Sequence, residues 1–424
     1  MQSRDKALAY HSRRQGKIQV VSKVPVDNQD DLSLAYTPGV AEPCREIHRD
    51  KARVYDYTNR GNTVAIVTDG SAVLGLGDIG PEAGLPVMEG KAILFKMFGG
   101  IDAVPICLAT QDPDSIVETV RLLEPTFGGI NLEDVSAPRA FEIERRLKEA
   151  LSIPVFNDDQ HGTAVVVGAA LLNALKFTGK DPATVRVVFN GAGAAGIATA
   201  RLLRLLGIRN ITLVDRFGIL HPAEADKMNP YQAEAADWSN PEGRRGNLAE
   251  ALRGADVFIG VSVAGALTMD MMQGMNPDSI VFALANPVPE IWPVQALLVG
   301  ARIVGTGRSD FPNQINNVLG FPGVMRGALD TRALEINDPI KVAAAHALAG
   351  LIADEDLRDD YIIPHPMDRR VAPRVAAAVA EAAVGSGVAR VTVSPDEVAN
   401  HCRELVAEYD ALVSQGRGEE GRMP

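Results

Sequence analysis

Two pairs of neighbouring carboxylates in the first half of the chain could bind a divalent cation. Glu133-Asp134 lies in GGINLEDVSAP, and Asp158-Asp159 lies in VFNDDQHGTA. Carboxylate oxygens without clustered Cys or His side chains are the ligands that Mg²⁺ and Mn²⁺ prefer. Each pair follows an apolar, strand-like stretch and precedes a helical pattern, the usual position of a site at the carboxyl ends of strands. Taken alone, either pair also fits helix N-capping by Asp134 and Asp158, which is the more common role.

Lys91 and Tyr36 have side chains that could transfer protons. Lys91 lies in the apolar segment PVMEGKAILFKMFGG. A lysine buried near a cation can lose its proton near neutral pH and act as a general base. The alternative is a solvated helix lysine, a description that also fits Lys96. Tyr36, in LAYTPGVAEPC, fits either a proton donor or an aromatic residue at the edge of a core.

A glycine-rich motif in the second half predicts a dinucleotide site. GAGAAG at 191–196 follows the strand-like VRVVFN and precedes the helical IATARLLRLL, and the next strand ends on Asp215. Gly191 would form the tight turn, Gly193 would let backbone N–H groups approach the pyrophosphate, and Gly196 would let the helix pack closely on the strand. Asp215 would accept hydrogen bonds from the adenosine ribose. The predicted cofactor-binding residues are Gly191, Gly193, Ala194, Ala195, Gly196 and Asp215.

A second GxGxxG, GLGDIG at 75–80, has a different setting. It lies within the stretch TDGSAVLGLGDIGPEAGLP (68–86), which is too rich in Gly and Pro for regular structure. Pro81 follows the motif at once, so we expect no helix to begin there and no dinucleotide to bind. Long ordered loops of this kind usually carry function, which makes this stretch a candidate part of the site.

Chain length and composition limit the class of protein. A chain of 424 residues is too long for one ordinary core and predicts two or three domains. With 42 basic and 54 acidic residues the formal charge is −12, which argues against nucleic acid or an anionic membrane as the main partner. Cys44, Cys107 and Cys402 form no CxxC pair, which is typical of a reducing compartment. We recognise no secretory signal and no membrane-spanning apolar run, so a cytoplasmic location is expected.

The pattern of elements predicts an α/β fold in three parts. Residues 1–160 alternate short strands and helices and are expected to form an N-terminal α/β catalytic domain. Residues 161–325 show strand, glycine turn, helix and further buried strands, the pattern of a Rossmann-type, doubly wound parallel sheet. Residues 326–424 are mostly alanine-rich helix, expected to pack back on the first domain. The tail, 414–424, has no core-forming residues and is expected to be disordered.

Several of these segments resemble the malic enzyme family in its shorter bacterial form. The matching stretches are LAYTPGVAEPC (34–44), TDGSAVLGLGDIGP (68–81), MEGKAILFKMFGGIDAVPI (88–106), GGINLEDVSAPR (128–139), VFNDDQHGTA (155–164), NGAGAAGIA (190–198), ALANPVPEI (283–291) and GTGRSDFPNQINNVLGFPG (305–323). The resemblance covers roughly residues 15–390. The longer, animal-type enzymes have an arginine in the TDG…LGLGD loop that grips a malate carboxylate, whereas this chain has Ala72, as the shorter bacterial forms do.

The resemblance implies a role for each candidate residue. Lys91 matches the general base that takes the proton from the C2 hydroxyl of malate, and Asp158 matches a carboxylate that supports this lysine. Tyr36 matches the general acid that protonates C3 of the enolate. The implied metal ligands are Glu133, Asp134 and Asp159. The implied substrate contacts are Asn286 and Asn317, with Asn316 beside it, and the loop N–H groups around Ser71.

The resemblance therefore implies oxidation and decarboxylation of (S)-malate to pyruvate and CO₂, with reduction of a nicotinamide cofactor and with Mg²⁺ or Mn²⁺. Two alternatives are a malolactic enzyme, which retains the cofactor and releases lactate, and a catalytically inactive cofactor-sensing protein. NAD is favoured over NADP because Asp215 would repel a 2′-phosphate, although Arg216 beside it suits NADP. A homodimer or a larger even assembly is also implied.

Overall fold

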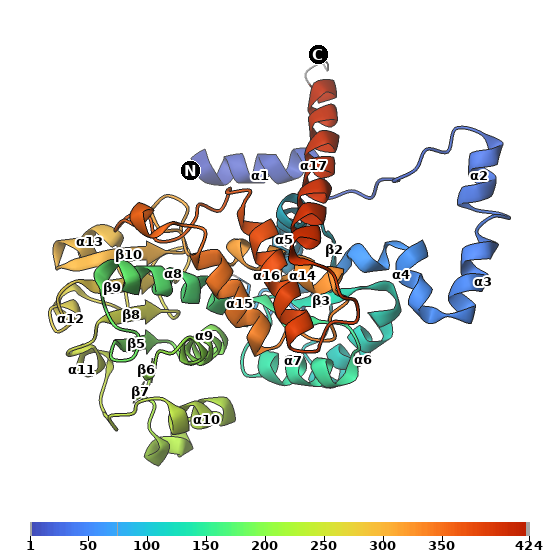
Figure 1. The fold of residues 1–424 in the computed structure, drawn as a ribbon. Coiled ribbons are helices and arrows are strands. Elements are labelled where there is room, and N and C mark those ends of the chain that lie inside the picture. The colour runs from blue at the N-terminus through green and yellow to red at the C-terminus, as the bar shows by residue number, and fades with distance from the viewer. Residues whose placement is uncertain (1, 74, 421–424) are drawn as a thin grey trace.

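The computed structural model describes residues 2–73 and 75–420, and its first half is built around a four-stranded parallel sheet with the order β2-β1-β3-β4 (Figure 1). The strands are β1 (Thr63–Thr68), β2 (Asp102–Cys107), β3 (Gly129–Leu132) and β4 (Val155–Asn157). The helices of this part are α5 (Pro81–Gly99), α6 (Pro113–Leu123) and α7 (Arg139–Ala150). Leu132 pairs with Asn157, so the residues that follow β3 and β4 emerge side by side at one edge of the sheet.

Helix α5 begins at Pro81, directly after the second glycine motif, where the sequence predicted no helix. The prediction was wrong because proline is favourable at the first position of a helix, where its fixed φ is helical and its missing N–H is not needed. The loop before α5 is irregular, as expected. Gly70 has a φ of 70° there, and a side chain on it would overlap the backbone of Gly80. This close contact folds the loop back on itself at the start of α5.

The second half contains a six-stranded sheet with the order β10-β9-β8-β5-β6-β7. The strands are β5 (Arg186–Asn190), β6 (Asn210–Asp215), β7 (Gly218–Ile219), β8 (Val257–Gly260), β9 (Ser279–Ala283) and β10 (Ala301–Thr306). All neighbours are parallel except β6 and β7, which form a tight antiparallel hairpin. The helices are α9 (Ala194–Leu205), α10 (Pro230–Trp238), α11 (Leu248–Leu252), α12 (Met269–Met272) and α13 (Pro293–Leu298). The chain therefore reverses its direction across the sheet between β5 and β8, which is where doubly wound sheets bind ligands.

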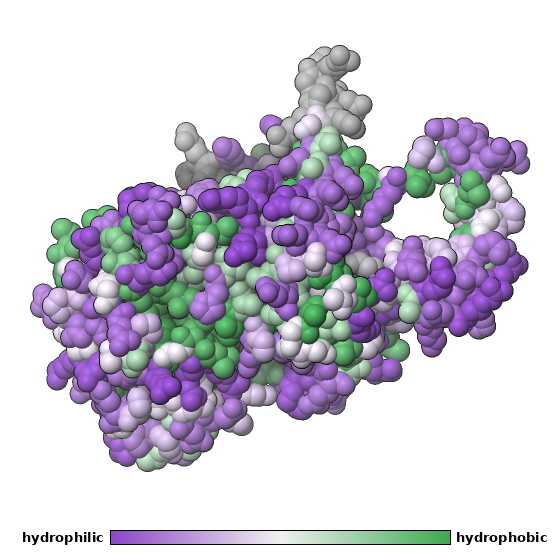
Figure 2. All heavy atoms as spheres, viewed as in Figure 1, coloured by the Kyte–Doolittle hydropathy of each residue, from purple (hydrophilic) through white to green (hydrophobic). Residues whose placement is uncertain are grey.

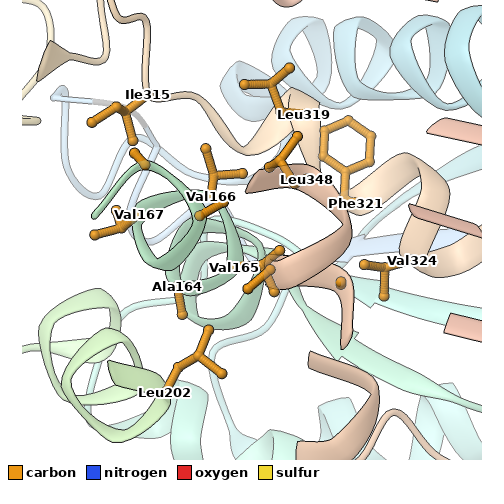
Figure 3. Close-up of a cluster of buried hydrophobic side chains, with 14 of the residues drawn as sticks. Ala164, Val165, Val166, Val167, Leu202, Ile315, Leu319, Phe321, Val324 and Leu348 are labelled. Carbon is orange, nitrogen blue, oxygen red and sulfur yellow. The ribbon is translucent and has the colours of Figure 1, made fainter. Parts of the chain in front are cut away.

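Helix α8 (Thr163–Thr178) links the two sheets in the sequence and forms the centre of the largest core. It is apolar on nearly every side, which is typical of a core helix. Figure 3 shows Val165 and Val166 of α8 in one cluster with Leu202 of α9, and with Phe321 and Leu348 from the C-terminal helices. The two halves of the molecule therefore share one hydrophobic core.

Four helices form the C-terminal part, namely α14 (Phe321–Asp330), α15 (Asp338–Ala349), α16 (Val371–Gly385) and α17 (Pro395–Glu420). Helices α14 and α17 contact α5, and α15 contacts α8 (Figure 1). The structure differs from the expected disordered tail, because α17 continues as a helix to Glu420. Residues 421–424 of that predicted tail lie outside the described residues.

The N-terminal segment contrasts with this packed body. It contains α1 (Gln2–Arg14), α2 (Gln29–Ala35), α3 (Ala41–Arg49) and α4 (Val54–Tyr57). We call residues 18–57 the N-terminal arm, and none of them is buried. Figure 1 shows α2 and α3 standing away from the sheets, and Figure 2 shows open space between α2 and the body. Large apolar side chains exposed on the arm are Ile18, Val20, Val21, Val24, Val26, Leu32, Leu34, Tyr36, Val40 and Tyr57.

Short helical turns complete the described chain. They are η1 (Lys51–Arg53), η2 (Asn59–Asn62), η3 (Glu124–Thr126), η4 (Asp158–Gly162), η5 (Pro222–Lys227), η6 (Asn317–Leu319) and η7 (Asp354–Asp356). Of these, η4 is a π-helical turn and the others are 3₁₀ turns. Across the residues that the structure describes, no helix combines the length and apolar character needed to cross a membrane.

Candidate active site

Three carboxylates meet where β3 and β4 end. One ligand oxygen from each of Glu133, Asp134 and Asp159 lies within 4.8 Å of the other two. Asp134 adopts a φ of 54°, and its backbone N–H donates a hydrogen bond of 2.7 Å to Asp159 Oδ2. The Asn131 amide donates to Glu133 Oε2 at 2.9 Å and orients that side chain. An all-oxygen group of this size fits Mg²⁺ or Mn²⁺, so the structure brings together the three residues that the family resemblance implies as metal ligands.

Lys91 reaches the same place from α5. Its side chain is only 7% exposed, and its ammonium lies 2.9 Å from Glu133 Oε1 and also contacts Asp158 Oδ2. The ammonium lies over the ring of Phe321, 4.1 Å from the ring centre. The Asn317 amide donates to the same oxygen of Asp158 at 2.6 Å. Lys91, Asp158 and Asn317 therefore form one connected group, next to the three clustered carboxylates.

Burial and mutual repulsion shape the ionisation of this cluster. Burial raises the pKa of Asp158. The positive charge of Lys91 lowers this pKa, the negative charge of Glu133 raises it, and together they bring it to about 7. Burial, then Glu133 and Asp134, raise the pKa of Asp159 well above its usual value. Burial would lower the pKa of Lys91, but Asp158 and Glu133 outweigh it and raise the pKa instead. One lysine therefore faces a surplus of buried carboxylates, which a divalent cation would neutralise.

The position of Lys91 adds a condition to the proton-transfer hypothesis. The sequence argument required a lysine buried near a cation and poised to lose its proton. In this structure Lys91 is paired with two carboxylates, which raise its pKa and favour its charged form. A role as a base requires one of these carboxylates to take another partner.

The glycine-rich loop is tied to the carboxylate cluster by a network that the sequence did not suggest. The Asp69 carboxylate accepts hydrogen bonds from both the backbone N–H and the hydroxyl of Ser71, at 2.9 and 2.5 Å. The Ser71 hydroxyl accepts from the backbone N–H of Ser136 at 2.9 Å. Arg139 donates to Asp69 at 3.3 Å. The N–H groups of Ser71 and Ala72 are thus already bonded within the protein, the second to Asp134 O at 2.9 Å, and are not free for a substrate carboxylate.

Asn286 and Asn316 occupy different settings from Asn317. Asn286 is exposed, between Gly75 of the first half and Gly307 of the second, and a side chain on either glycine would overlap it. It therefore lies where the glycine-rich loop meets the second sheet. The Asn316 side chain instead caps the η6 turn by accepting from the N–H of Val318 at 3.0 Å. This contact gives Asn316 a structural role in positioning Asn317.

Tyr36 is not brought to Lys91. It ends helix α2 on the N-terminal arm, and it is 68% exposed. Lys91 is buried in the body, and the contacts recorded for its ammonium are with Glu133, Asp158 and Phe321. The proposed base and the proposed acid are therefore separate in this chain as it stands.

The predicted dinucleotide site has the geometry expected of its glycines. Gly191 has a φ of 115°, and a side chain on it would overlap the carbonyl of Val261 after β8. A side chain on Gly196 would overlap the carbonyl of Gly191, so α9 can approach β5 only with glycine at this position. Gly193 faces open space, with no atom within 4 Å of where a Cβ would lie. Gly191 and Gly196 thus allow close backbone packing in the turn, while the space beside Gly193 is open. Ala194 and Ala195 begin α9 next to this space.

Asp215 lies at the end of β6, as predicted, and is held there by its neighbours. Its Oδ1 accepts from the N–H of Arg216 at 2.6 Å, and its Oδ2 accepts from Gln232 of α10. Gln232 also donates to the carbonyl of Ala192 in the glycine turn at 3.2 Å. The strand ends at Asp215, and the exposed Arg216 lies in the β6–β7 turn, so alternation along a strand does not decide which way Arg216 points.

A doubly wound sheet with an open glycine turn, joined to a second sheet that carries a lysine–carboxylate cluster, defines a dinucleotide-binding enzyme. Comparison with protein families identifies which one. Residues 15–148 match the malic enzyme N-terminal domain, and residues 160–384 match the malic enzyme NAD binding domain. The chain belongs to the malic enzyme family.

Individual relatives agree with this assignment. The chain is 59% identical to the bifunctional malic/malolactic enzyme of Bacillus subtilis, over 96% of this chain and 99% of that protein. It is 56% identical to the NAD-dependent malic enzyme of Geobacillus stearothermophilus, over 88% and 78%. It is 48% identical to an NADP-dependent malic enzyme of Rhizobium meliloti, over 96% and 55%. The crystal structure of malic enzyme from Pyrococcus horikoshii is similar with a TM-score of 0.94 and 48% identity, over 98% of both chains.

Proposed function

We propose that this protein oxidises (S)-malate with a nicotinamide cofactor and decarboxylates the product to pyruvate and CO₂, with Mg²⁺ or Mn²⁺ bound by Glu133, Asp134 and Asp159. The observation that carries this proposal is the position of Glu133. Its carboxylate belongs to the three-residue cation site and is also one of the two partners of Lys91. The candidate base and the candidate cation site are therefore coupled through one side chain.

This coupling supports Lys91 as the general base. With Glu133 committed to a cation, Lys91 keeps Asp158 as its remaining carboxylate partner, and its pKa falls. In its neutral form Lys91 can then take the proton of the C2 hydroxyl and become an ammonium ion, while Asp158, fixed by Asn317, holds the lysine in place. When bound, the cation would stabilise negative charge on the C2 oxygen, and the nicotinamide would accept the hydride from C2.

We assign the second proton transfer, to C3 of the enolate, to Tyr36 of a second copy of the chain. The N-terminal arm has no buried residue, yet it carries a row of exposed apolar side chains, including Leu32 and Leu34 beside Tyr36. Exposed apolar surface of this kind marks an interaction site. A homodimer in which the arm of one copy packs at the Lys91 site of the other would bury these side chains and complete both sites.

NAD is the proposed cofactor, and a malolactic reaction is the second candidate. Asp215 is held at the end of β6 where the adenosine ribose binds in doubly wound sheets, and its charge disfavours a 2′-phosphate. The malolactic candidate is favoured by the name of the Bacillus subtilis relative, which is 59% identical. In that reaction the cofactor stays bound and lactate is released.

One assay separates these functions. The purified protein is supplied with malate and Mn²⁺ or Mg²⁺, with NAD⁺ and NADP⁺ in parallel, and reduced cofactor, pyruvate and lactate are measured. Equal amounts of pyruvate and reduced cofactor, abolished by EDTA and restored by Mn²⁺, are expected. Lactate without net cofactor reduction would support the malolactic reaction instead. Absence of all three products, from protein that binds the dinucleotide, would leave a cofactor-sensing protein.

A further inference from the structure

Glu144 is a buried carboxylate that neither the sequence nor the proposed mechanism uses. It lies on α7, is 5% exposed, and has three close partners. Its Oε1 lies 2.7 Å from His161 Nε2 and 2.5 Å from Lys148 Nζ, and its Oε2 accepts from Gln160 Nε2 at 3.1 Å. Two of these partners belong to η4, directly after Asp159 in the sequence. Glu144 therefore connects α7 to the turn that carries both Asp158 and Asp159.

The η4 turn has an uncommon backbone that needs support. It is a five-residue π-helical turn, a rare conformation that is frequently found at functional sites. The Asn157 side chain accepts from the N–H of Gln160 at 3.2 Å at its start. At its end only a glycine fits, because a side chain on Gly162 would overlap the Asp158 carboxylate. Glu144 adds side-chain contacts to two of the residues between these ends.

The charges around Glu144 make these contacts strong. Burial would raise the pKa of Glu144, but His161 and Lys148 outweigh it and lower the pKa to about 2. Because an ionised carboxylate only accepts hydrogen bonds, the His161 ring nitrogen that faces it, Nε2 at 2.7 Å, is the donor. Hydrogen bonds to a charged acceptor are roughly twice as strong as bonds between neutral groups. Both donors from η4 therefore point at one fixed anion.

We propose that Glu144 is a positioning residue for the cation site, which by holding Gln160 and His161 fixes the turn of η4 and thereby the direction of the Asp159 carboxylate. This inference rests on the proposed cation site at Glu133, Asp134 and Asp159. Residues that hold metal ligands from behind affect metal affinity by about 10- to 100-fold when they are replaced. Glu144 acts one step further back, through the backbone turn rather than through a bond to the ligand itself.

The test measures binding of Mn²⁺ to the full-length protein, without substrate, by the electron paramagnetic resonance signal of the free ion. Glu144→Gln keeps the size of the side chain and an acceptor for His161, but it sets an amide NH₂ against the NH₂ of Gln160. We expect Mn²⁺ to bind about tenfold more weakly, while the affinity for NADH is unchanged. Glu142→Gln is the matched control, because Glu142 lies on the same helix and pairs with Arg146 at the surface. It should bind Mn²⁺ like wild type.

A reciprocal exchange and a milder variant complete the test. Glu144→Gln combined with Gln160→Glu restores an acid–amide pair, and Mn²⁺ binding should recover to within about threefold of wild type. Gln160→Ala removes one contact and should weaken Mn²⁺ binding even if Glu144→Gln does not fold. Normal Mn²⁺ affinity in both Glu144→Gln and Gln160→Ala would overturn this inference alone. A wild-type protein that binds no Mn²⁺ would overturn the proposed cation site and this inference together.

Discussion

The lysine–carboxylate cluster and the N-terminal arm both contain residues to which the family resemblance assigns chemistry, but the structure organises them in opposite ways. Lys91 is 7% exposed and paired with two carboxylates, whereas Tyr36 is 68% exposed at the end of a short helix. The cluster draws on α5, β3, β4 and η6, which share packed cores. The arm contributes nothing to those cores.

This difference suggests that the two proposed proton transfers depend on different levels of structure. The cluster is set by the fold of one chain, because parallel strands bring Glu133 and Asp158 together and buried α5 brings Lys91. The position of the arm is not set in this way, since helix α2 has no buried residue. The first step should therefore depend on single residues of one chain, and the second on assembly.

The largest effect is expected inside the cluster. Lys91→Ala removes the proposed base and leaves its two buried partners, Glu133 and Asp158, without their counter-ion, so kcat should fall by about 10²–10⁴-fold. Binding of NADH, measured by fluorescence, should stay as in wild type because the glycine turn is untouched. Lys96→Ala is the matched control. Lys96 lies on the same helix, but its ammonium pairs with Asp102 at 2.7 Å and not with the carboxylates that surround Lys91. A Lys91→Ala enzyme within about threefold of wild type would exclude the lysine as the base.

The arm should show its role by complementation between copies. Tyr36→Phe should lower pyruvate formation strongly, while reduction of added oxaloacetate to malate is less affected, because the phenyl ring still packs but gives no proton. Unfolding and refolding an equal mixture of Tyr36→Phe and Lys91→Ala chains should recover about a quarter of wild-type activity, since half the dimers are mixed and each has one intact site.

The control for this mixing experiment is each variant refolded alone, which should remain inactive. Recovery in the mixture requires that Lys91 and Tyr36 of one site come from different chains. If both variants refold into dimers and the mixture stays inactive, Tyr36 acts within its own chain, and the arm must fold over the body to reach Lys91.

The same comparison shows what could be predicted from the sequence. The two acidic pairs and Lys91 were found because strand ends and residue types are local signals, and the fold only had to bring neighbouring strands together. Glu144 was missed because its partners in η4 lie 16 and 17 residues away and nothing in RAFEIERRLKEA distinguishes it from the half-buried Glu142. The helix at Pro81 was missed because a proline after a glycine loop was interpreted as a break rather than as a helix start.

A smaller effect is expected where the two halves of the molecule meet. Gly75 has no room for a side chain against the carbonyl of Asn286, so Gly75→Ala should push the glycine-rich loop away from the second sheet. We expect an increase of about tenfold in the KM for malate with a smaller change in kcat, because Asn286 would no longer be placed correctly to bind malate. Gly385→Ala is the control, since nothing lies within 4 Å of its added Cβ. Unchanged kinetics in Gly75→Ala would mean that Asn286 does not depend on this contact.

The smallest effect concerns the choice of cofactor. This prediction tests the dinucleotide site in the second half of the chain, whose residues, like those of the lysine–carboxylate cluster, are already held in place by the fold. Asp215 is anchored on both oxygens, by Arg216 N–H and by Gln232, so its charge stays close to the expected position of the ribose. Wild type should therefore have a higher kcat/KM for NAD⁺ than for NADP⁺. Asp215→Ala removes that charge, and the ratio should shift toward NADP⁺ by about tenfold.

Arg216 decides how complete this preference is. It is exposed in the β6–β7 turn, one residue beyond Asp215, and a guanidinium there can pair with a 2′-phosphate. Arg216→Ala should therefore lower kcat/KM for NADP⁺ and leave NAD⁺ nearly unchanged, the opposite of the change at Asp215. Combining the two substitutions should cancel most of the shift, because one removes repulsion and the other removes attraction at the same phosphate. A wild type that prefers NADP⁺ strongly, and loses that preference with Arg216→Ala, would show that the arginine rather than the aspartate governs the pocket. The anchoring of Asp215 by Gln232 would then serve to hold the glycine turn and not to select the ribose.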